Sequence, residues 1–205
     1  MTRAAFHRET PDARRQSLIE ATARCLARLG TGGTSVRAIC AEAGVSAGLL
    51  RHYFEGVDAL VMATYAHVGD HVADTLEAAV EAAGDDPRAR LDAYVTASFR
   101  PPIADPALLS TWLAFWSLVK TDPVIAAHHA AVYGDSRARM EALIADCLPD
   151  PGAADVRLAA VAITALVDGL WLELCLDPTT FSATEAAAIT RRWVDTLVAE
   201  PGFGR

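Results

Sequence analysis

Proline and glycine divide this chain into apolar stretches of helical periodicity. Proline follows a residue that can cap a helix, or breaks an apolar run, at Thr10-Pro11, Asp86-Pro87, Asp122-Pro123 and Asp177-Pro178. Proline suits the first helical position, and Thr or Asp before it can cap the new helix. Between these points apolar residues recur at helical spacing, and no stretch alternates as a half-buried strand does. Alanine, the best helix former, is abundant. The predicted fold class is therefore all-α.

We expect about nine helices, which cover approximately residues 10–29, 35–43, 47–54, 57–83, 88–99, 106–119, 122–147, 155–176 and 182–199. The chain shows no repeat and no low-complexity tract, and the tail after Pro201 is expected to be disordered. With 205 residues, 52% of them hydrophobic, the chain can form one small and one mid-sized unit that share a core.

Charge is distributed unevenly along the chain. The formal net charge is −8, which by itself argues against a nucleic-acid partner. Residues 1–55, however, contain eight Arg and five acidic residues, a net of +3, whereas the remainder contains ten basic and 21 acidic residues, a net of −11. This split indicates that only the N-terminal segment meets a polyanion.

Residues 34–54, with the sequence TSVRAICAEAGVSAGLLRHYF, contain two short helices separated by a tight turn. Ser35 can cap the first helix and Gly44 can end it. Ser46 can then cap the second helix. Two helices of two to three turns around a glycine-containing turn form a helix-turn-helix.

This segment resembles the DNA-binding signature of the TetR family of bacterial regulators. The resemblance rests on Ser35, Ile39, the Ala43-Gly44-Val45-Ser46 turn, Gly48 and the closing His52-Tyr53-Phe54. The helix count and order elsewhere are also similar, so the resemblance covers nearly the whole chain. It implies a DNA-binding domain at residues 10–55, a ligand-sensing and dimerisation domain at 56–200, and repression of a palindromic operator that a small molecule relieves.

The second helix of the pair is expected to enter the major groove. Leu50 and Phe54, at i and i+4, can face the core, while Arg51 on the opposite side can fork onto a guanine edge or a phosphate. Ala47 and Gly48 are small enough for base edges to approach. The predicted DNA-contacting residues are Ser35, Arg37, Ser46, Ala47, Gly48, Leu49, Arg51, His52 and Tyr53.

Other members of this set have expected roles of their own. Ser35, Tyr53 and the amides at the helix start can bind phosphates, and Leu49 can touch a thymine methyl. The resemblance implies a base or phosphate contact for Arg37. One position departs from the family: Val57 stands where a phosphate-binding lysine is common, and Arg14 or Arg15 are candidates to compensate.

Two later stretches, TWLAFWS at 111–117 and ALVDGLWLELCL at 165–176, resemble the C-terminal domain of BetI-type repressors of the choline and betaine pathway. We predict that they line the effector site, with Trp112, Phe115, Trp116, Asp168 and Trp171 as ligand-binding residues. Trp112, Phe115 and Trp116 lie at i, i+3 and i+4, so they share a helix face and form either a pocket wall or plain core.

Asp168 lies in an otherwise apolar stretch, where a buried acid is costly unless it is paired or hydrogen-bonded. It either holds a helix N-terminus or balances a cationic ligand. Aromatic rings and a carboxylate can recognise a quaternary ammonium, so choline or a related organic cation is the leading prediction. A polyamine effector, a neutral apolar effector and the absence of any ligand stay open.

The segment from residue 155 to 176 is apolar nearly all round, which predicts burial on more than one side. We therefore expect a homodimer through the last two long helices, as is common in the TetR family, with interface candidates Ala160, Ile163, Val167, Leu170, Trp193 and Leu197. A two-fold dimer would also present two recognition helices to a palindromic site.

Several other classes are disfavoured. No phosphate loop, nucleophile motif or metal tetrad is found, so neither catalysis nor a cofactor is expected. His67 and His71, at i and i+4, lack a further ligand at diagnostic spacing, and the four cysteines show no metal-type spacing. His128-His129 is interpreted as a surface pair. The N-terminus has no apolar signal core, and charges at Asp168 and Glu173 interrupt the longest apolar run, so we expect a cytoplasmic protein without a membrane partner.

Overall fold

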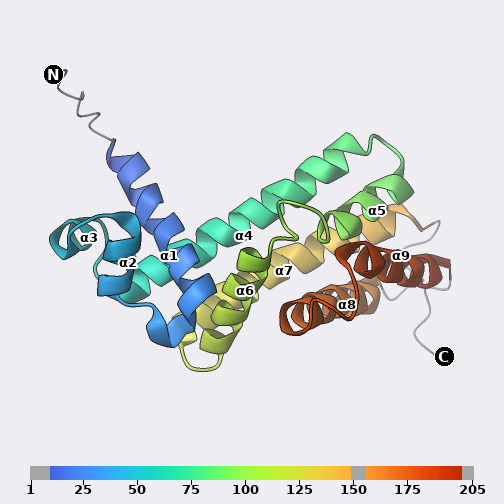
Figure 1. The fold of residues 1–205 in the computed structure, drawn as a ribbon. Coiled ribbons are helices and arrows are strands. Elements are labelled where there is room, and N and C mark those ends of the chain that lie inside the picture. Colours follow the sequence, from blue (N-terminus) through green and yellow to red (C-terminus); the bar gives the residue numbers. More distant parts are fainter. Residues whose placement is uncertain (1–9, 149–155, 200–205) are drawn as a thin grey trace, which may run out of the picture.

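The computed structural model describes residues 10–148 and 156–199, and within these ranges it contains nine helices and no strand (Figure 1). This confirms the predicted all-α fold. The helices are α1 Pro11–Gly33, α2 Val36–Ala43, α3 Ala47–Tyr53, α4 Val57–Ala82, α5 Pro87–Ala97, α6 Pro106–Val119, α7 Pro123–Asp146, α8 Val156–Leu176 and α9 Ala183–Ala199. The predicted tail after Pro201 and the loop at residues 149–152 lie outside the described residues.

The helix starts are fixed by local capping. The side chains of Asp86, Asp105 and Asp122 each accept a hydrogen bond from a backbone amide in the first turn of α5, α6 and α7. In all three helices proline follows the cap. This combination satisfies one of the free amides and presets the backbone, which is why the sequence predicts these boundaries well.

The end of α1 differs from the prediction. The sequence indicates that Gly30 ends the helix and that Gly32 and Gly33 form a loop. Instead, Gly30 adopts φ 63° and ψ −173°, which kinks the chain, and a further turn continues to Gly33. The hydroxyl of Thr34 donates to the carbonyl oxygen of Gly30 at 2.7 Å and closes this turn. Gly30 is thus a kink within the helical segment, because only glycine adopts this φ without strain.

Buried side chains form two clusters. The smaller cluster fills the centre of α1–α3 and includes Leu18, Ile39 and Leu50, all fully buried. The larger cluster lies among α4–α9. α1 and α4 contribute to both, since Leu26 of α1 belongs to the larger cluster and Leu60 of α4 to the smaller one. These two helices therefore join the N-terminal unit to the rest of the molecule.

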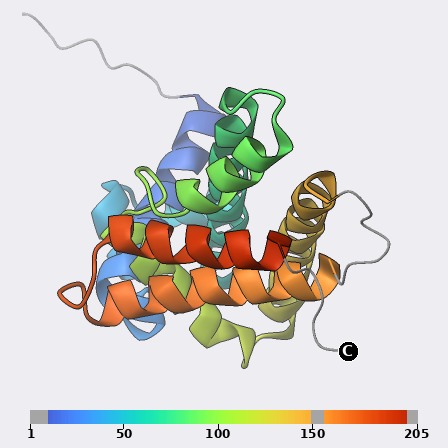
Figure 2. The same cartoon turned by 90° about the vertical axis from the view of Figure 1, so that its right-hand side faces the viewer.

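The last two helices lie side by side across one end of the molecule, where no other described helix covers them (Figure 2). Among the described helices, α8 alone is long and apolar enough to cross a membrane by length and composition. Only 22% of its most apolar window is buried inside the protomer. A helix of this kind needs a further apolar cover, and Asp168 and Glu173 within it argue against lipid as that cover.

Candidate DNA-binding surface and effector cavity

The helix-turn-helix is built by two serine caps and one glycine turn. Ser35 accepts from the amide of Ala38 at 3.3 Å, and Ser46 accepts from the amide of Leu49 at 3.2 Å. Gly44, at φ 65°, ends α2 in the left-handed conformation that glycine adopts most readily. The local sequence therefore determines the angle at which α3 leaves α2.

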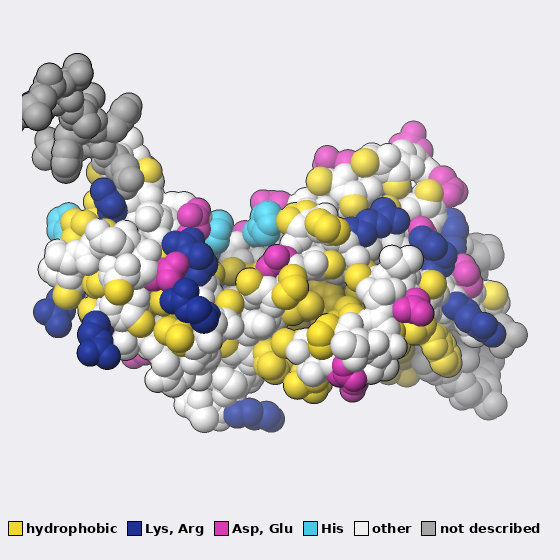
Figure 3. Space-filling model, viewed as in Figure 1, with side chains coloured by type: hydrophobic (Ala, Val, Ile, Leu, Met, Phe, Trp, Pro, Cys, Tyr) yellow, Lys and Arg dark blue, Asp and Glu magenta, His cyan; other side chains and the backbone are white. Residues whose placement is uncertain are grey.

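The structure leaves the predicted DNA-contacting residues of α2, α3 and their caps accessible. Leu50 is fully buried and Phe54 is 6% exposed, so they anchor α3 on the core. The nine predicted DNA-contacting residues are all exposed or half-buried: Ser35, Arg37, Ser46, Ala47, Gly48, Leu49, Arg51, His52 and Tyr53. Basic side chains are prominent over this N-terminal part of the molecule (Figure 3).

The arginines near this surface fall into two groups. Arg24 and Arg28 of α1 both pair with Glu42, at 2.7 and 2.9 Å, and so hold α2 against α1. Arg37 and Arg51 make no ion pair with any residue that the structure describes. Their charges are thus available to an external partner. Arg15, a candidate replacement for the missing lysine, lies over the ring of Phe54 with its guanidinium carbon 5.0 Å from the centroid.

A cavity of about 430 Å³ lies among the C-terminal helices. Its lining comes from five helices: Gly69, Asp70, Val72, Ala73, Leu76 and Glu77 of α4; Tyr94, Val95 and Ser98 of α5; Trp112 of α6; Val132, Tyr133, Asp135, Ser136, Arg139 and Met140 of α7; and Thr164, Val167, Asp168 and Trp171 of α8. Its volume falls in the range of pockets that hold small organic ligands.

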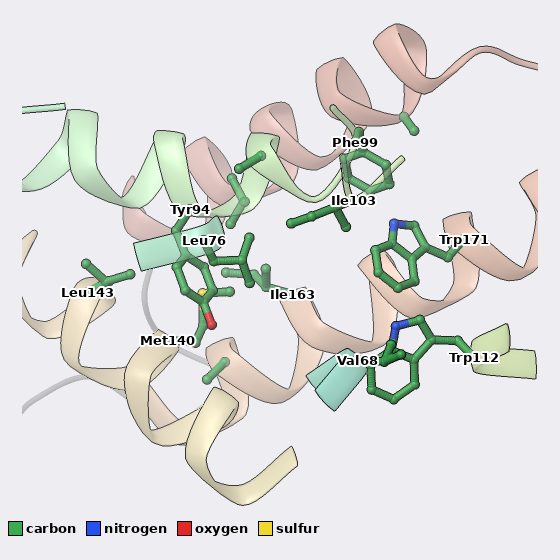
Figure 4. Close-up of a cluster of buried hydrophobic side chains, with 14 of the residues drawn as sticks. Val68, Leu76, Tyr94, Phe99, Ile103, Trp112, Met140, Leu143, Ile163 and Trp171 are labelled. Carbon is green, nitrogen blue, oxygen red and sulfur yellow. The ribbon is translucent and has the colours of Figure 1, made fainter. Parts of the chain in front are cut away.

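One end of the cavity, called the Asp168 end below, is formed by aromatic rings and one carboxylate. Trp112 and Trp171 are 5% and 8% exposed, and Figure 4 shows their indoles next to each other on one side of the buried cluster. The Trp171 indole donates to the carbonyl oxygen of Ser98 at 3.0 Å, which fixes its orientation. Tyr133 and Asp168 complete this end.

Asp168 is held in a largely apolar setting by one hydrogen bond. The hydroxyl of Tyr133 donates to Oδ1 of Asp168 at 3.3 Å, and the indole of Trp116 donates to the same hydroxyl at 3.1 Å. Burial raises the pKa of Asp168 to about 6, although the bond from Tyr133 opposes this shift. The carboxylate is therefore costly to ionise without a cation, and a cation that binds beside it removes that cost.

The three aromatic residues of α6 have different surroundings. Trp112 lines the cavity, whereas Trp116 lines a second, more open pocket of about 330 Å³ on the other side of Tyr133 and Asp168. Phe115 lines neither pocket: it is fully buried, with its ring centroid 4.3 Å from that of Tyr65. Helical spacing places these residues on one face, but the neighbouring helices divide that face.

The two adjacent histidines of α7 are packed, and the prediction of a surface pair is wrong. His129 Nδ1 lies 2.8 Å from the hydroxyl of Tyr65, and its ring centroid is 4.2 Å from that of Tyr133. The ring of His128 lies edge-on to Tyr65 at 5.1 Å. Burial is also the main reason that the pKa of His129 is lowered, so its ring is predominantly neutral at pH 7. His129 lies here because the buried hydroxyl of Tyr65 needs a hydrogen-bond partner.

His67 and His71 do not form a metal site in the structure. Nε2 of His67 lies 3.0 Å from Nε2 of Gln16 on α1, and His71 is exposed. No group of three potential metal-binding side chains occurs among the residues described. His67 instead links α4 to α1.

Two of the six interface candidates are wrong. Ala160 and Ile163 are fully buried inside the protomer, because α8 turns the face carrying residues 159, 160 and 163 toward the core. Val167 lines the cavity, and Leu170 and Leu197 are half-buried. Trp193 is 54% exposed, and the exposed apolar side chains beside it on α8 and α9 are Val161, Leu176 and Ile189.

Sequence reasoning missed residues of α4, α5 and α7 that line the two pockets or bond to their lining. Tyr65, Tyr94, Tyr133 and Arg139 lie on helices without a distinguishing motif. The available signal was weak: tyrosines at helical core positions need a hydrogen-bond partner, but spacing along one helix does not identify that partner.

A helix-turn-helix joined through shared core helices to an all-helical unit with a cavity defines the architecture of a transcriptional regulator. Comparisons agree with this class. The family of bacterial regulatory proteins of the TetR type matches residues 18–64, and the C-terminal family of BetI-type transcriptional repressors matches residues 87–199.

Curated relatives extend the match over most of the chain. The HTH-type transcriptional regulator BetI 2 of Chromohalobacter salexigens is 35% identical over 92% of this chain and 90% of its own length. BetI of Pectobacterium atrosepticum is 34% identical over 89% and 92%. A solved structure from Pseudomonas aeruginosa PAO1 is 42% identical, covers 96% of both chains and has a TM-score of 0.84. The chain belongs to the TetR family, with a BetI-type C-terminal domain, and these relatives have a non-enzymatic role.

Proposed function

We propose that this protein is a repressor that binds a palindromic operator as a homodimer and is released by a small organic cation, with choline or a related quaternary ammonium as the leading candidate. The observation that carries the proposal is the Asp168 end of the cavity, where a carboxylate lies among aromatic rings. Hydrogen bonds and ring contacts connect this carboxylate to α4. The proposal divides the chain into a DNA-binding domain at 10–55 and a sensing and dimerisation domain at 56–200, and it places the protein in the cytoplasm.

The surface of α3 supports the DNA-binding part. A methyl group at Gly48 would meet only the hydroxyl oxygen of Ser46, at 3.9 Å, so the protein's own packing does not require glycine there. Glycine inside a helix costs about 1 kcal/mol relative to alanine. An external partner that approaches the backbone closely gives this residue a purpose, and DNA base edges are such a partner.

Arg51→Ala should weaken operator binding by about 1–3 kcal/mol, because Arg51 is exposed, unpaired among the described residues and placed to bond a base edge. The operator is first selected from random duplexes, and affinity is then measured by fluorescence anisotropy at fixed salt. Arg28→Ala is the matched control, since Arg28 pairs with Glu42. Equal affinities for Arg51→Ala and wild type would remove Arg51 from the DNA surface.

The uncovered face of α8 and α9 supports the dimer. Val161, Leu176, Ile189 and Trp193 are 40–66% exposed on adjacent helices of one surface. A contiguous exposed apolar patch on a protein in water marks an interaction site, and we infer that these four side chains belong to one. A second copy related by a two-fold axis covers it with the same residues and pairs two recognition helices.

The chemistry around Asp168 supports an organic cation. Each cation–π contact in a desolvated site contributes about 2 kcal/mol, and Trp112, Trp171 and Tyr133 all line this end. A solved structure from Saccharomonospora viridis, 18% identical with a TM-score of 0.77, is in complex with choline. A polyamine or a neutral apolar effector is the competing candidate, while the open volume of the cavity counts against a regulator without any ligand.

A continuous set of contacts provides a route from the cavity to the DNA-binding unit. A cation at Asp168 competes for the oxygen that Tyr133 bonds, and the ring of Tyr133 packs on His129, which bonds the buried Tyr65 of α4. Only three residues separate the end of α3 from the start of α4. Ligand binding can therefore shift the recognition helix only if the cation prefers one arrangement of these groups.

Tyr65→Phe should reduce this coupling while leaving each binding event intact. Choline affinity of the free protein and operator affinity without choline should both stay within about twofold, because Tyr65 touches neither ligand. The ratio of choline affinities between free and operator-bound protein should fall at least fivefold. Calorimetric titration of both forms measures it. Tyr94→Phe, which removes a hydroxyl bonded to Ser136, is the control. An unchanged ratio would exclude the route through Tyr65.

A further inference from the structure

We propose that the effector is longer than choline: a cationic head at Asp168, an apolar middle, and an uncharged hydrogen-bonding group that binds at the opposite end of the cavity, beside the ion pair of Glu77 and Arg139. This inference rests on the proposed function and specifies the chemical class of its effector. Four features of the cavity carry it: its length, its far end, its middle and its volume.

The cavity is elongated because α4 and α7 run in parallel along it. Near the Asp168 end, a Cβ at Gly69 would lie 3.7 Å from Val132. At the other end Glu77 bonds Arg139. At 1.5 Å of rise per residue, Gly69 and Glu77 are about 12 Å apart along α4. A ligand with a single small head group cannot contact both ends.

The far end is polar, and its ion pair is electrically balanced, while the carboxylate of Asp135 lines the cavity one turn before Arg139 on α7. Arg139 donates from Nε and Nη2 to the two carboxylate oxygens of Glu77, at 2.6 and 2.8 Å. The hydroxyls of Tyr94 and Ser136 lie 3.3 Å apart beside this pair. A bidentate pair has no net charge to attract a second ion, yet it still offers donors and acceptors. A hydroxyl or amide group can bond this pair and the two hydroxyls without a charge of its own.

The middle of the cavity is apolar. Val72, Leu76, Val95 and Val167, from α4, α5 and α8, line the space between the two ends. Figure 4 shows Leu76 and Tyr94 in this region, well separated from the two indoles. A hydrocarbon linker that displaces water from these side chains gains affinity with each buried methylene.

The volume agrees with a longer ligand. One water molecule takes about 30 Å³ of the liquid, and bonded atoms take less, so the heavy atoms of choline occupy at most roughly 200 Å³. The cavity offers about 430 Å³, so half of it stays unfilled around choline. The unfilled half contains the Glu77 and Arg139 pair and the Tyr94 and Ser136 hydroxyls.

Calorimetry with three trimethylammonium probes tests the inference on the full-length dimer. Choline, octyltrimethylammonium and 8-hydroxyoctyltrimethylammonium share the head group, and only the last has a neutral polar end. Octyltrimethylammonium should bind at least tenfold tighter than choline. In Tyr94→Phe and Ser136→Ala, the affinity of the hydroxylated probe relative to the octyl probe should fall at least threefold, with choline affinity unchanged.

The outcomes separate the two proposals. If choline binds as tightly as both long probes, the second subsite is wrong and the cationic effector stands. If a bis-quaternary cation of the same length binds wild type more tightly than the hydroxylated probe, the far end takes a charge and the uncharged group is wrong. If no cation binds more tightly than millimolar, the cationic effector itself fails, and the subsite proposal fails with it.

Discussion

Asp168→Asn should stabilise the ligand-free protein and weaken its binding of organic cations. The folded-state pKa of Asp168 is about 6, above its ordinary value of 3.8, so the folded protein binds more protons than the unfolded chain between these pH values. Wild-type stability therefore falls as pH rises from about 4 to about 6, by at most about 3 kcal/mol. Asparagine keeps an oxygen for Tyr133 and avoids this cost, so the variant's advantage is absent at pH 4 and full above pH 7.

The same substitution should cost about 2–5 kcal/mol of choline affinity, because it removes one partner of a desolvated charge pair. In wild type, choline affinity should fall about tenfold for each pH unit well below 6, since protonation of the carboxylate competes with the ligand. The variant should lack this dependence. Other titratable groups also surround Asp168. The outer pocket, on the Trp116 side, is lined by Tyr133, His129 and Lys120. The main cavity is lined by Asp70, Glu77, Asp135 and Arg139.

Chemical denaturation between pH 4 and 8 and calorimetry at the same pH values measure both effects. Glu173→Gln is the matched control: it makes the same charge change on the exposed side of α8. If Asp168→Asn binds choline as tightly as wild type at pH 7.5, the carboxylate does not hold the cation. If the variant is no more stable than wild type at pH 8, Asp168 already has a compensating partner in the ligand-free protein.

Trp193→Asp together with Val161→Asp should convert the proposed dimer to a monomer and weaken operator binding more than a hundredfold. Both side chains are exposed in the protomer, at 54% and 40%, so the substitutions leave the core intact. Each introduces a charge into an apolar interface, and two-fold symmetry doubles the number of charges. An interface that holds a stable dimer buries over about 1,000 Å², and it should not tolerate four carboxylates.

Sedimentation equilibrium at micromolar concentration gives the oligomeric state, and anisotropy with the selected operator gives the affinity. Val124→Asp is the control, because Val124 is an apolar residue with 62% exposure in the first turn of α7 and belongs to neither α8 nor α9. Circular dichroism must show unchanged helix content. A double variant that stays dimeric would place the interface elsewhere, and a monomer with full operator affinity would remove the requirement for a dimer.

Local sequence signals predict the helices well because their physical causes act within one turn. The caps at Ser35 and Ser46 and the proline that follows Asp105 or Asp122 each fix a helix start without help from distant residues. Gly30 shows the limit of such signals. A glycine with positive φ fits both a helix end and a kink, and the bond from Thr34 settles which one forms.

The C-terminal helices show why the pattern along a single helix does not identify all the residues of a site. Trp112, Phe115 and Trp116 share a face of α6, yet the first lines the main cavity, the second is core and the third lines the outer pocket. Likewise, the apolar pattern of α8 predicts burial on more than one side but not which residues face the protomer's own core. For that reason the pattern predicts Ala160 and Ile163 at the dimer interface, whereas both are buried inside the protomer.

The sequence by itself therefore determined the all-α class, the helix-turn-helix with its outward Arg51, the basic N-terminal segment and the presence of an acid in an apolar helix. The tertiary structure alone decided what surrounds that acid. Tyr133 and His129 come from α7, Tyr65 from α4 and Trp112 from α6, and no spacing within one helix relates them. Caps and periodicity are local free-energy terms, whereas a cavity is the space that five packed helices leave unfilled, so its shape and chemistry depend on all of them together.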